Sequence, residues 1–133
     1  MRPQDIPRRQ ERLLLADATE QLEKLFVRRF FNVERMSTFI DVLHVLRALW
    51  SATLRGQALT AEQIGHTIGM PRTTALRKLR YLIVLGHVTQ EGSKYIISDK
   101  TLRTTTPILD RTIKLILETS DALRAVQNGP QKN

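Results

Sequence analysis

Basic side chains gather on one short segment of this sequence. Four arginine or lysine residues fall between positions 72 and 80, and no aspartate or glutamate occurs between Glu62 and Glu91. A solvated helix normally mixes charges of both signs, because Glu–Lys pairs one turn apart stabilise it. Unrelieved positive charge repels itself, so an anionic partner explains the run better than an ordinary solvated face, which is the alternative. The basic residues are Arg72, Arg77, Lys78 and Arg80.

The composition of the whole chain agrees with a polyanionic partner. Its 133 residues include 21 Lys and Arg against 13 Asp and Glu, a net charge of +8, and residues 59–103 carry half of that excess. The chain is 41% hydrophobic and 26% charged, as soluble globular chains are, and no apolar run approaches the ~20 residues of a membrane span. The N-terminus lacks the apolar stretch of a secretory signal, so we expect a cytoplasmic protein that binds nucleic acid rather than membranes.

The sequence offers little for catalysis or metal binding. It has no cysteine, which excludes a thiol nucleophile, a disulfide framework and a thiolate metal site. The three histidines lack metal-ligand spacing, and no glycine-rich phosphate loop occurs. We expect His44 and His87 to pack within the fold and His66 to be the one candidate neighbour of a bound phosphate. The prediction is a protein that is not an enzyme and needs no cofactor or metal.

The first third of the chain predicts a long helix from Ile6 to Asn32. Asp5 suits the position before a helix, and Pro7 is tolerated in a first turn. Apolar residues recur every three or four positions, the spacing of one stripe on a helix. They are Leu15, Ala18, Leu22, Leu25 and Phe26. A break is expected near residues 32–37.

A second helix is predicted from about Thr38 to Arg55. Ser37 is its expected N-cap, and Gly56 follows its end, where glycine can adopt a left-handed conformation. The spacing of its large apolar residues is that of a core helix. The predicted stripe is Phe39, Leu43, Leu46, Trp50 and Leu54, flanked by Val42 and Leu49.

A capping box predicts the start of a third, short helix. The Thr60 hydroxyl and the Gln63 amide can each bond the other residue's backbone N–H. We expect Ile64 and Ile68 to face inward and Gly69 to end the helix.

A fourth helix is expected to start at Pro71, reach about Leu85 and stop at Gly86. One face should be buried, and it consists of Ala75, Leu79 and Leu82. Two β-prone runs around a glycine-containing turn then predict a hairpin, with strands at residues 87–90 and 94–98.

The sequence closes with a last predicted helix, from Ile108 to about Gln127, after a breaker and helix-start signal at residues 104–107. Two neighbouring apolar stripes run along it. One holds Leu109, Ile113, Ile116 and Leu123, and the other Ile108, Leu115, Ala122 and Val126.

The order of short helix, tight turn, basic helix and hairpin is that of a helix-turn-helix followed by a wing. Residues 59–97 resemble the winged-helix domain of the MarR and IclR families of bacterial transcriptional regulators. The resemblance rests on Leu59-Thr60-Ala61-Glu62-Gln63-Ile64-Gly65, on Ile68-Gly69-Met70-Pro71-Arg72-Thr73-Thr74-Ala75-Leu76-Arg77-Lys78-Leu79, on Leu82, on Gly86-His87-Val88 and on Tyr95-Ile96-Ile97. One departure is Pro71, where these families often place a serine or threonine cap. Helices on both sides, and no large effector domain after the hairpin, make MarR the closer resemblance.

The resemblance implies a mainly α fold with a minor β part. It divides the chain into an N-terminal helix (1–36), a winged helix-turn-helix unit (37–103), a C-terminal helix (104–128) and a disordered tail (129–133). In the MarR family the terminal helices of two chains intertwine as a homodimer; the alternative is that both fold back on their own subunit. The expected dimer contacts are Leu15, Leu22, Leu25, Ile108, Ile113, Ile116 and Leu123.

By the same resemblance, a recognition helix at 71–85 and a wing at 87–98 would contact double-stranded DNA. Arg77 is the best candidate for a bidentate contact to guanine, and Leu76 for a thymine methyl. The full expected set is Thr60, Arg72, Thr73, Thr74, Leu76, Arg77, Lys78, Arg80 and Lys94. Lys78 and Arg80 would bind phosphates, and Thr60 would hold one through backbone N–H groups at a helix start.

Several of these residues have plainer interpretations. Thr73 and Thr74 can serve only to open a helix, Leu76 can be partly buried, and Lys94 can be a solvated turn residue.

The predicted function is a homodimeric, sequence-specific transcriptional regulator of a palindromic DNA site, with a repressor favoured over an activator. Alternatives are a winged-helix module for protein interaction or assembly, and a non-specific nucleoid-type DNA binder. The resemblance also implies a small lipophilic effector. Its candidate contacts are Phe26, Phe30 and Trp50, for which ordinary core packing is the alternative.

Overall fold

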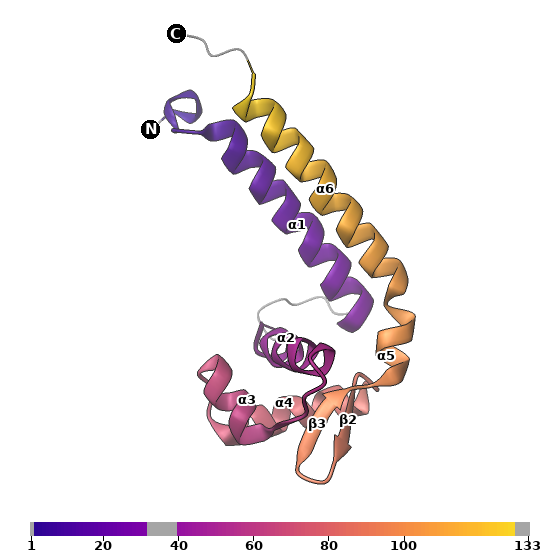
Figure 1. Cartoon of the computed structure of the whole chain (residues 1–133). Helices are drawn as coiled ribbons and strands as arrows, with labels where there is room; N and C mark the ends of the chain where they lie inside the picture. The colour runs from indigo at the N-terminus through magenta and orange to yellow at the C-terminus, as the bar shows by residue number, and fades with distance from the viewer. Residues whose placement is uncertain (1, 32–39, 130–133) are drawn as a thin grey trace. The chain divides into compact units, whose positions relative to one another are not determined.

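A computed structural model describes residues 2–31 and 40–129, with side chains at 2–26 and 40–129. The chain is mainly helical, with one small antiparallel sheet (Figure 1). It divides into two compact units. The terminal unit comprises Met1–Val33 and Thr106–Asn133, and the central unit is Glu34–Thr105.

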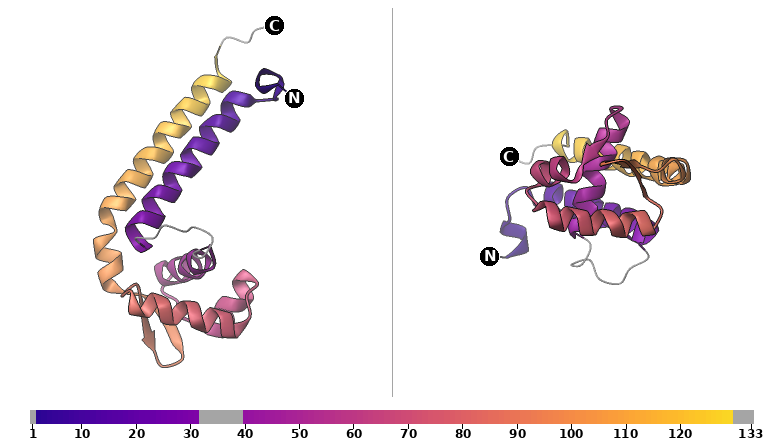
Figure 2. Two further views of the ribbon diagram at one scale, coloured as in Figure 1. Left: turned by 180° about the vertical axis from the view of Figure 1, so that it is seen from behind. Right: turned by 90° about the horizontal axis from the view of Figure 1, so that it is seen from below.

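The terminal unit is a pair of antiparallel helices. A 3-10 turn (Pro3–Asp5) precedes α1 (Arg9–Phe31), and α1 packs along α6 (Thr106–Gln127). The side-chain amide of Gln127, at the end of α6, donates to Glu11 near the start of α1 at 3.3 Å. Figures 1 and 2 show the two helices running side by side over most of their lengths.

The predicted start of the first helix at Ile6 was wrong. Ile6 has an extended backbone, Arg8 has φ +54°, and α1 begins only at Arg9, because helical residues need φ near −63°. Asp5 lies in the 3-10 turn instead of capping α1. The Arg8 guanidinium binds both carboxylate oxygens of Glu11, at 3.0 and 2.6 Å, and this hydrogen bonding lowers the pKa of Glu11. The break predicted at 32–37, with Ser37, lies outside the described residues.

The central unit contains four helices and the sheet among its described residues. In the sheet, β3 lies between β1 and β2 and is antiparallel to both. The elements are α2 (Ile40–Leu54), β1 (Leu59–Thr60), α3 (Ala61–Ile68), α4 (Arg72–Val84), β2 (Val88–Glu91), β3 (Lys94–Ile97) and α5 (Asp99–Thr104).

The core of the central unit forms where α2, α3, α4 and β3 meet. Its fully buried large side chains are Val45, Leu49, Ile64, Leu79, Leu82 and Ile97. The stripe predicted for α2 was partly wrong, since Leu54 is 67% exposed and Leu43 and Trp50 are half-buried. Helix α2 packs on α3, α4 and β3 at once, so its buried face is broader than the predicted stripe and points in a different direction. The buried residues are Val42, Val45, Leu46, Leu49 and Ala52. Phe39 lies outside the described residues.

Two short elements were not predicted. Strand β1 has only two residues, and its pairing of Leu59 with Tyr95 joins positions far apart in the sequence. Helix α5 begins after Ser98, whose hydroxyl accepts from the backbone N–H of Thr101 at 3.2 Å. The prediction had placed Ser98 at the end of a strand. Helix α6 begins at Thr106, within the segment 104–107, instead of at Ile108. Of the tail predicted at 129–133, residues 130–133 lie outside the described residues.

Candidate nucleic-acid interface

A capping box opens α3, as predicted. The backbone N–H of Thr60 donates to the Gln63 side-chain oxygen at 2.9 Å, and the N–H of Gln63 donates to the Thr60 hydroxyl at 3.2 Å. The Thr60 N–H is thus occupied by Gln63, and phosphate binding at the start of α3 stays a prediction. The role of Thr60 is to fix the start of the helix that supports α4.

The turn between α3 and α4 depends on two glycines. Gly69 has φ +71°, the left-handed conformation predicted for it, and the N–H of Met70 donates to the Gly65 carbonyl at 2.8 Å. A Cβ atom on Gly65 would lie 2.4 Å from the Met70 carbonyl oxygen, closer than side-chain carbons approach. Glycine at 65 therefore lets the chain turn tightly, and α4 starts after Pro71 at a fixed place beside α3.

Helix α4 rests on the core through one face. Ala75, Leu79 and Leu82 are completely buried, as their spacing predicted. The helix ends where Gly86 takes φ +83° and the N–H of His87 donates to the Leu82 carbonyl at 2.9 Å. In the view from behind, α4 lies nearest the viewer in the central unit (Figure 2). One side of α4 therefore packs against the core, and the opposite side faces outward.

The outward side of α4 is polar and basic. Arg72, Thr73, Arg77 and Arg80 are exposed, all from the predicted DNA-binding set. The other predicted residues of this helix, Thr74, Leu76 and Lys78, are half-buried at the edges of the face. Among the predicted residues, threonine and arginine side chains therefore lie at the centre of the outward side, and Leu76 does not.

The cations of this region have no partners within the described residues. Those residues form ion pairs in the N-terminal turn and within α1 and α6, and none on α4 or the hairpin. No side-chain hydrogen bond within the described part holds them either. The cations are Arg72, Arg77, Lys78, Arg80 and Lys94. Their charge is not neutralised by a described carboxylate, so the face attracts anions.

The hairpin of β2 and β3 stands beside α4, with which β2 is in contact. A two-residue turn, Gly92 and Ser93, joins its strands, and Gly92 has φ +63°. Lys94, the predicted contact in this region, is exposed and lies opposite Glu91 in the strand register.

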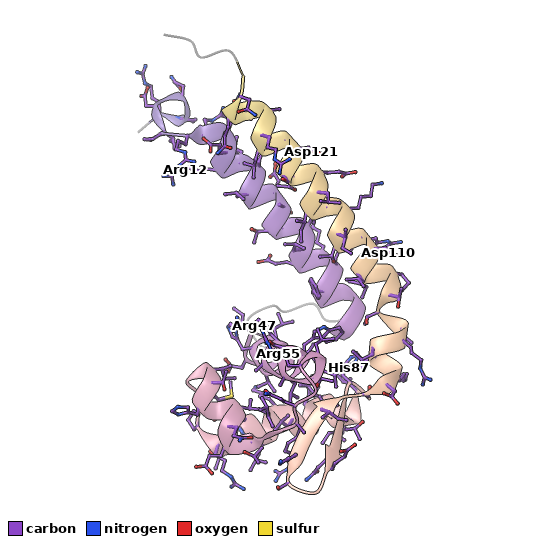
Figure 3. All side chains as sticks on the ribbon, in the orientation of Figure 1. Arg12, Arg47, Arg55, His87, Asp110 and Asp121 are labelled. Carbon is purple, nitrogen blue, oxygen red and sulfur yellow. The ribbon has the colours of Figure 1, made fainter. Side chains whose placement is uncertain are left out.

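A polar cluster fixes the base of the hairpin to the end of α4. The Ser98 hydroxyl donates to the Gly86 carbonyl at 2.6 Å, and the N–H of Ser98 donates to the His87 carbonyl at 2.9 Å. Thr101, on α5, lies 2.9 Å from Nδ1 of His87 through its hydroxyl. Figure 3 labels His87 in this position. The prediction that His87 packs at the start of the hairpin is confirmed, and the cluster makes α4 and the hairpin one rigid surface.

The other two histidines lie elsewhere on the surface. His44 was expected to be partly buried, but it is exposed on α2, with Nδ1 3.3 Å from a guanidinium nitrogen of Arg47. His66 is exposed on α3.

Sequence reasoning missed two residues of the outward face of α4. Tyr81 and Val84 are both exposed, and Val84 is 84% exposed. The available signal was their spacing of four and seven residues after Arg77, which places all three on one side of a helix.

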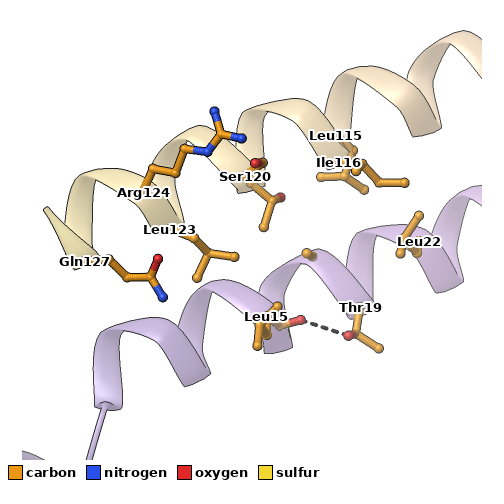
Figure 4. Close-up of a pocket in the computed structure, with 11 residues that line it drawn as sticks. Leu15, Thr19, Leu22, Leu115, Ile116, Ser120, Leu123, Arg124 and Gln127 are labelled. Atoms are coloured by element: carbon orange, nitrogen blue, oxygen red, sulfur yellow. Dashed lines mark hydrogen bonds between the residues drawn. The ribbon is translucent and has the colours of Figure 1, made fainter.

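A shallow groove runs between α1 and α6 in the terminal unit (Figure 4). Its apolar lining includes Leu15 and Ile116, each 53% exposed, while Leu22 and Leu123 are half-buried. Of the other predicted dimer contacts, Leu25 is half-buried and Ile113 is exposed. Ile108 is 5% exposed, so its side chain is already covered within the chain and does not belong to an exposed dimer face.

The expected effector contacts are not brought together in one unit. Phe26 belongs to the terminal unit and Trp50 to the central unit, and the side chain of Phe30 lies outside the described residues. Small-molecule binding stays a prediction.

No model of a known protein family matches the chain, and no curated protein sequence matches it either. Within residues 2–31 and 40–129, no helix has the length and apolarity of a membrane span, and no three His, Cys, Asp or Glu side chains group as metal ligands do.

Proposed function

We propose that this protein is a homodimeric, sequence-specific transcriptional regulator whose central unit binds double-stranded DNA as a winged helix-turn-helix. The observation that carries the proposal is the outward face of α4, where Arg72, Arg77 and Arg80 are exposed without partners among the described residues. An α-helix fits the major groove of B-DNA, and arginine is the side chain best suited to bind guanine there.

The support behind that face agrees with the proposal. A reading helix must be held rigidly, because base contacts need side chains in fixed positions. Ala75, Leu79 and Leu82 anchor α4 in the core, α3 braces it through the Gly65 turn, and the hairpin is bonded to its end. In the proposed complex α4 enters the groove, and Lys94 on the hairpin lies at the adjacent backbone.

Dimerisation would use the terminal unit. Two helices alone cannot enclose a core, and among the described side chains α1 has no buried residue and α6 has only Ile108. Exposed apolar residues recur on α6 at the i, i+4, i+7 and i+8 positions of one stripe. They are Leu109, Ile113, Ile116 and Leu117, and Leu15 lines the same groove as Ile116. A second copy of the pair would cover this stripe as a four-helix bundle.

DNA selection from a random pool, followed by fluorescence anisotropy, tests the DNA-binding proposal. We expect a palindromic site with half-sites about 34–36 Å apart, and log K falling with log salt at a slope near −0.9 per phosphate contact. Equal affinity for selected and random DNA would favour a non-specific nucleoid-type binder. Absence of DNA binding would favour a protein-interaction module.

Light scattering of the purified chain tests the dimer. We expect a dimer for the wild type and a monomer for Leu15→Glu combined with Ile116→Glu, because buried unpaired carboxylates oppose association. Ala16→Glu, which adds the same charge at an exposed position of α1, is the matched control and should remain dimeric. A monomeric wild type at micromolar concentration would contradict the proposed dimer. It would not bear on DNA binding by α4, which the anisotropy experiment tests.

A further inference from the structure

Two exposed side chains of α4 lie on one line along the helix. At 100° per residue, the direction opposite Ala75, Leu79 and Leu82 passes through Arg77 and Val84. The two residues are seven apart, so they lie on nearly the same line, about 10.5 Å apart along the helix axis.

Val84 is unusual for its position. It is the most exposed of the large apolar residues among the described side chains, at 84%, and it stands on the last turn of α4. Valine lowers helix propensity relative to alanine or lysine, so helix formation does not explain its presence there. The core does not explain it either, because the buried face of α4 is on the other side.

Between these two residues stand Arg80 and Tyr81, which are also exposed. The set Arg77, Arg80, Tyr81 and Val84 therefore has the spacing i, i+3, i+4 and i+7. Helices that lie lengthwise in the major groove present base-contacting residues at this spacing.

We infer that α4 lies lengthwise in the major groove and that Val84 contacts the C5 methyl group of a thymine. This inference rests on the proposed DNA-binding function and adds a specificity-determining residue to it. Base pairs along B-DNA are about 3.4 Å apart, so 10.5 Å corresponds to about three base pairs. The thymine read by Val84 is thus expected about three base pairs from the guanine read by Arg77.

The charge around Val84 favours DNA over a protein as the group that covers it. Arg77 and Arg80 lie on the same face, and no acidic residue occurs between Glu62 and Glu91. An apolar side chain among unpaired arginines matches the major groove at a thymine, where a methyl group lies between phosphates and hydrogen-bonding base edges.

Replacing thymine by uracil in the selected site tests this contact, because the exchange removes only the C5 methyl group. For the wild-type protein we expect uracil at one position of each half-site to weaken binding about fourfold, which equals ~0.8 kcal/mol for one buried methyl at 1.4 kcal/mol per factor of ten. Val84→Ser should bind the thymine and uracil sites equally. Ile40→Ser, which removes another exposed aliphatic side chain of the central unit, should keep the fourfold preference.

Three results would overturn the inference while leaving DNA binding intact. The first is a wild-type protein insensitive to uracil at every position, and the second is a Val84→Ser variant that keeps the preference. The third is a Val84→Ser variant whose oligomeric state changes, since that would assign Val84 to a protein contact. If the wild type binds no DNA at all, the proposed function fails, and this inference fails with it.

Discussion

Replacing Arg77 with alanine should weaken sequence-specific DNA binding and leave the stability of the fold almost unchanged. The Arg77 side chain is exposed and has no partner among the described residues, and alanine is the better helix former. We therefore expect the free energy of unfolding to change by less than about 0.5 kcal/mol, as for most surface substitutions. Loss of a bidentate contact to guanine costs about 1–3 kcal/mol, or roughly 5- to 150-fold in Kd.

The assay is fluorescence anisotropy at one fixed salt concentration, on the selected site and on random DNA of equal length. Arg77→Ala should lose affinity for the selected site and relax its base preference at one position, while its affinity for random DNA changes much less. Lys78→Ala, at the edge of the same helix, should weaken both DNAs alike, because phosphate contacts carry no sequence information. Arg9→Ala removes the same charge from exposed α1 and should change neither. A folded Arg77→Ala protein with wild-type affinity for both DNAs would show that Arg77 does not contact a base.

Three further outcomes concern the scaffold. Thr60→Ala should lower the free energy of unfolding by ~1 kcal/mol in denaturant titrations, because it removes the capping hydroxyl, and an unchanged midpoint would contradict this. Gly65→Ala should cost about 1–3 kcal/mol, since its Cβ would meet the Met70 carbonyl oxygen at 2.4 Å, and wild-type stability would show that the turn can relax. The pKa of Glu11 is lowered by its hydrogen bond from Arg8, so stabilisation of the start of α1 is present above the ordinary glutamate pKa and is lost as pH falls through the lower folded value. An NMR titration should find the pKa of Glu11 below the ~4.3 of a free glutamate, and Arg8→Ala should raise it towards that value.

Much of the site was predictable because its signals are local. The capping box at Thr60 and Gln63, and the left-handed glycine that ends α3, each involve backbone groups within a few residues. The buried face of α4 follows from its apolar spacing alone. For the same reason the hairpin was found from two β-prone runs around Gly92.

The errors share the opposite cause. Helix α5 was missed because Ser98 follows strand β3 and also caps α5. The residue type alone does not show whether a serine ends a strand or starts a helix. The buried face of α2 was predicted in the wrong direction because α3, α4 and β3 cover the helix from several directions at once. Ile108 was predicted to contact a second subunit because an apolar stripe alone does not show whether the same chain or another chain covers it.

Local sequence patterns were enough to predict where most helices begin and end, which face of α4 is buried, and that the remaining faces of that helix carry cations and no acidic residue. These properties depend on neighbours within one or two turns. Only the tertiary structure shows that Leu59 pairs with Tyr95, that Ile108 is covered within the chain, and that Val84 is left exposed. Exposure at the end of a helix depends on what distant elements cover, and no local spacing encodes which of them pack there.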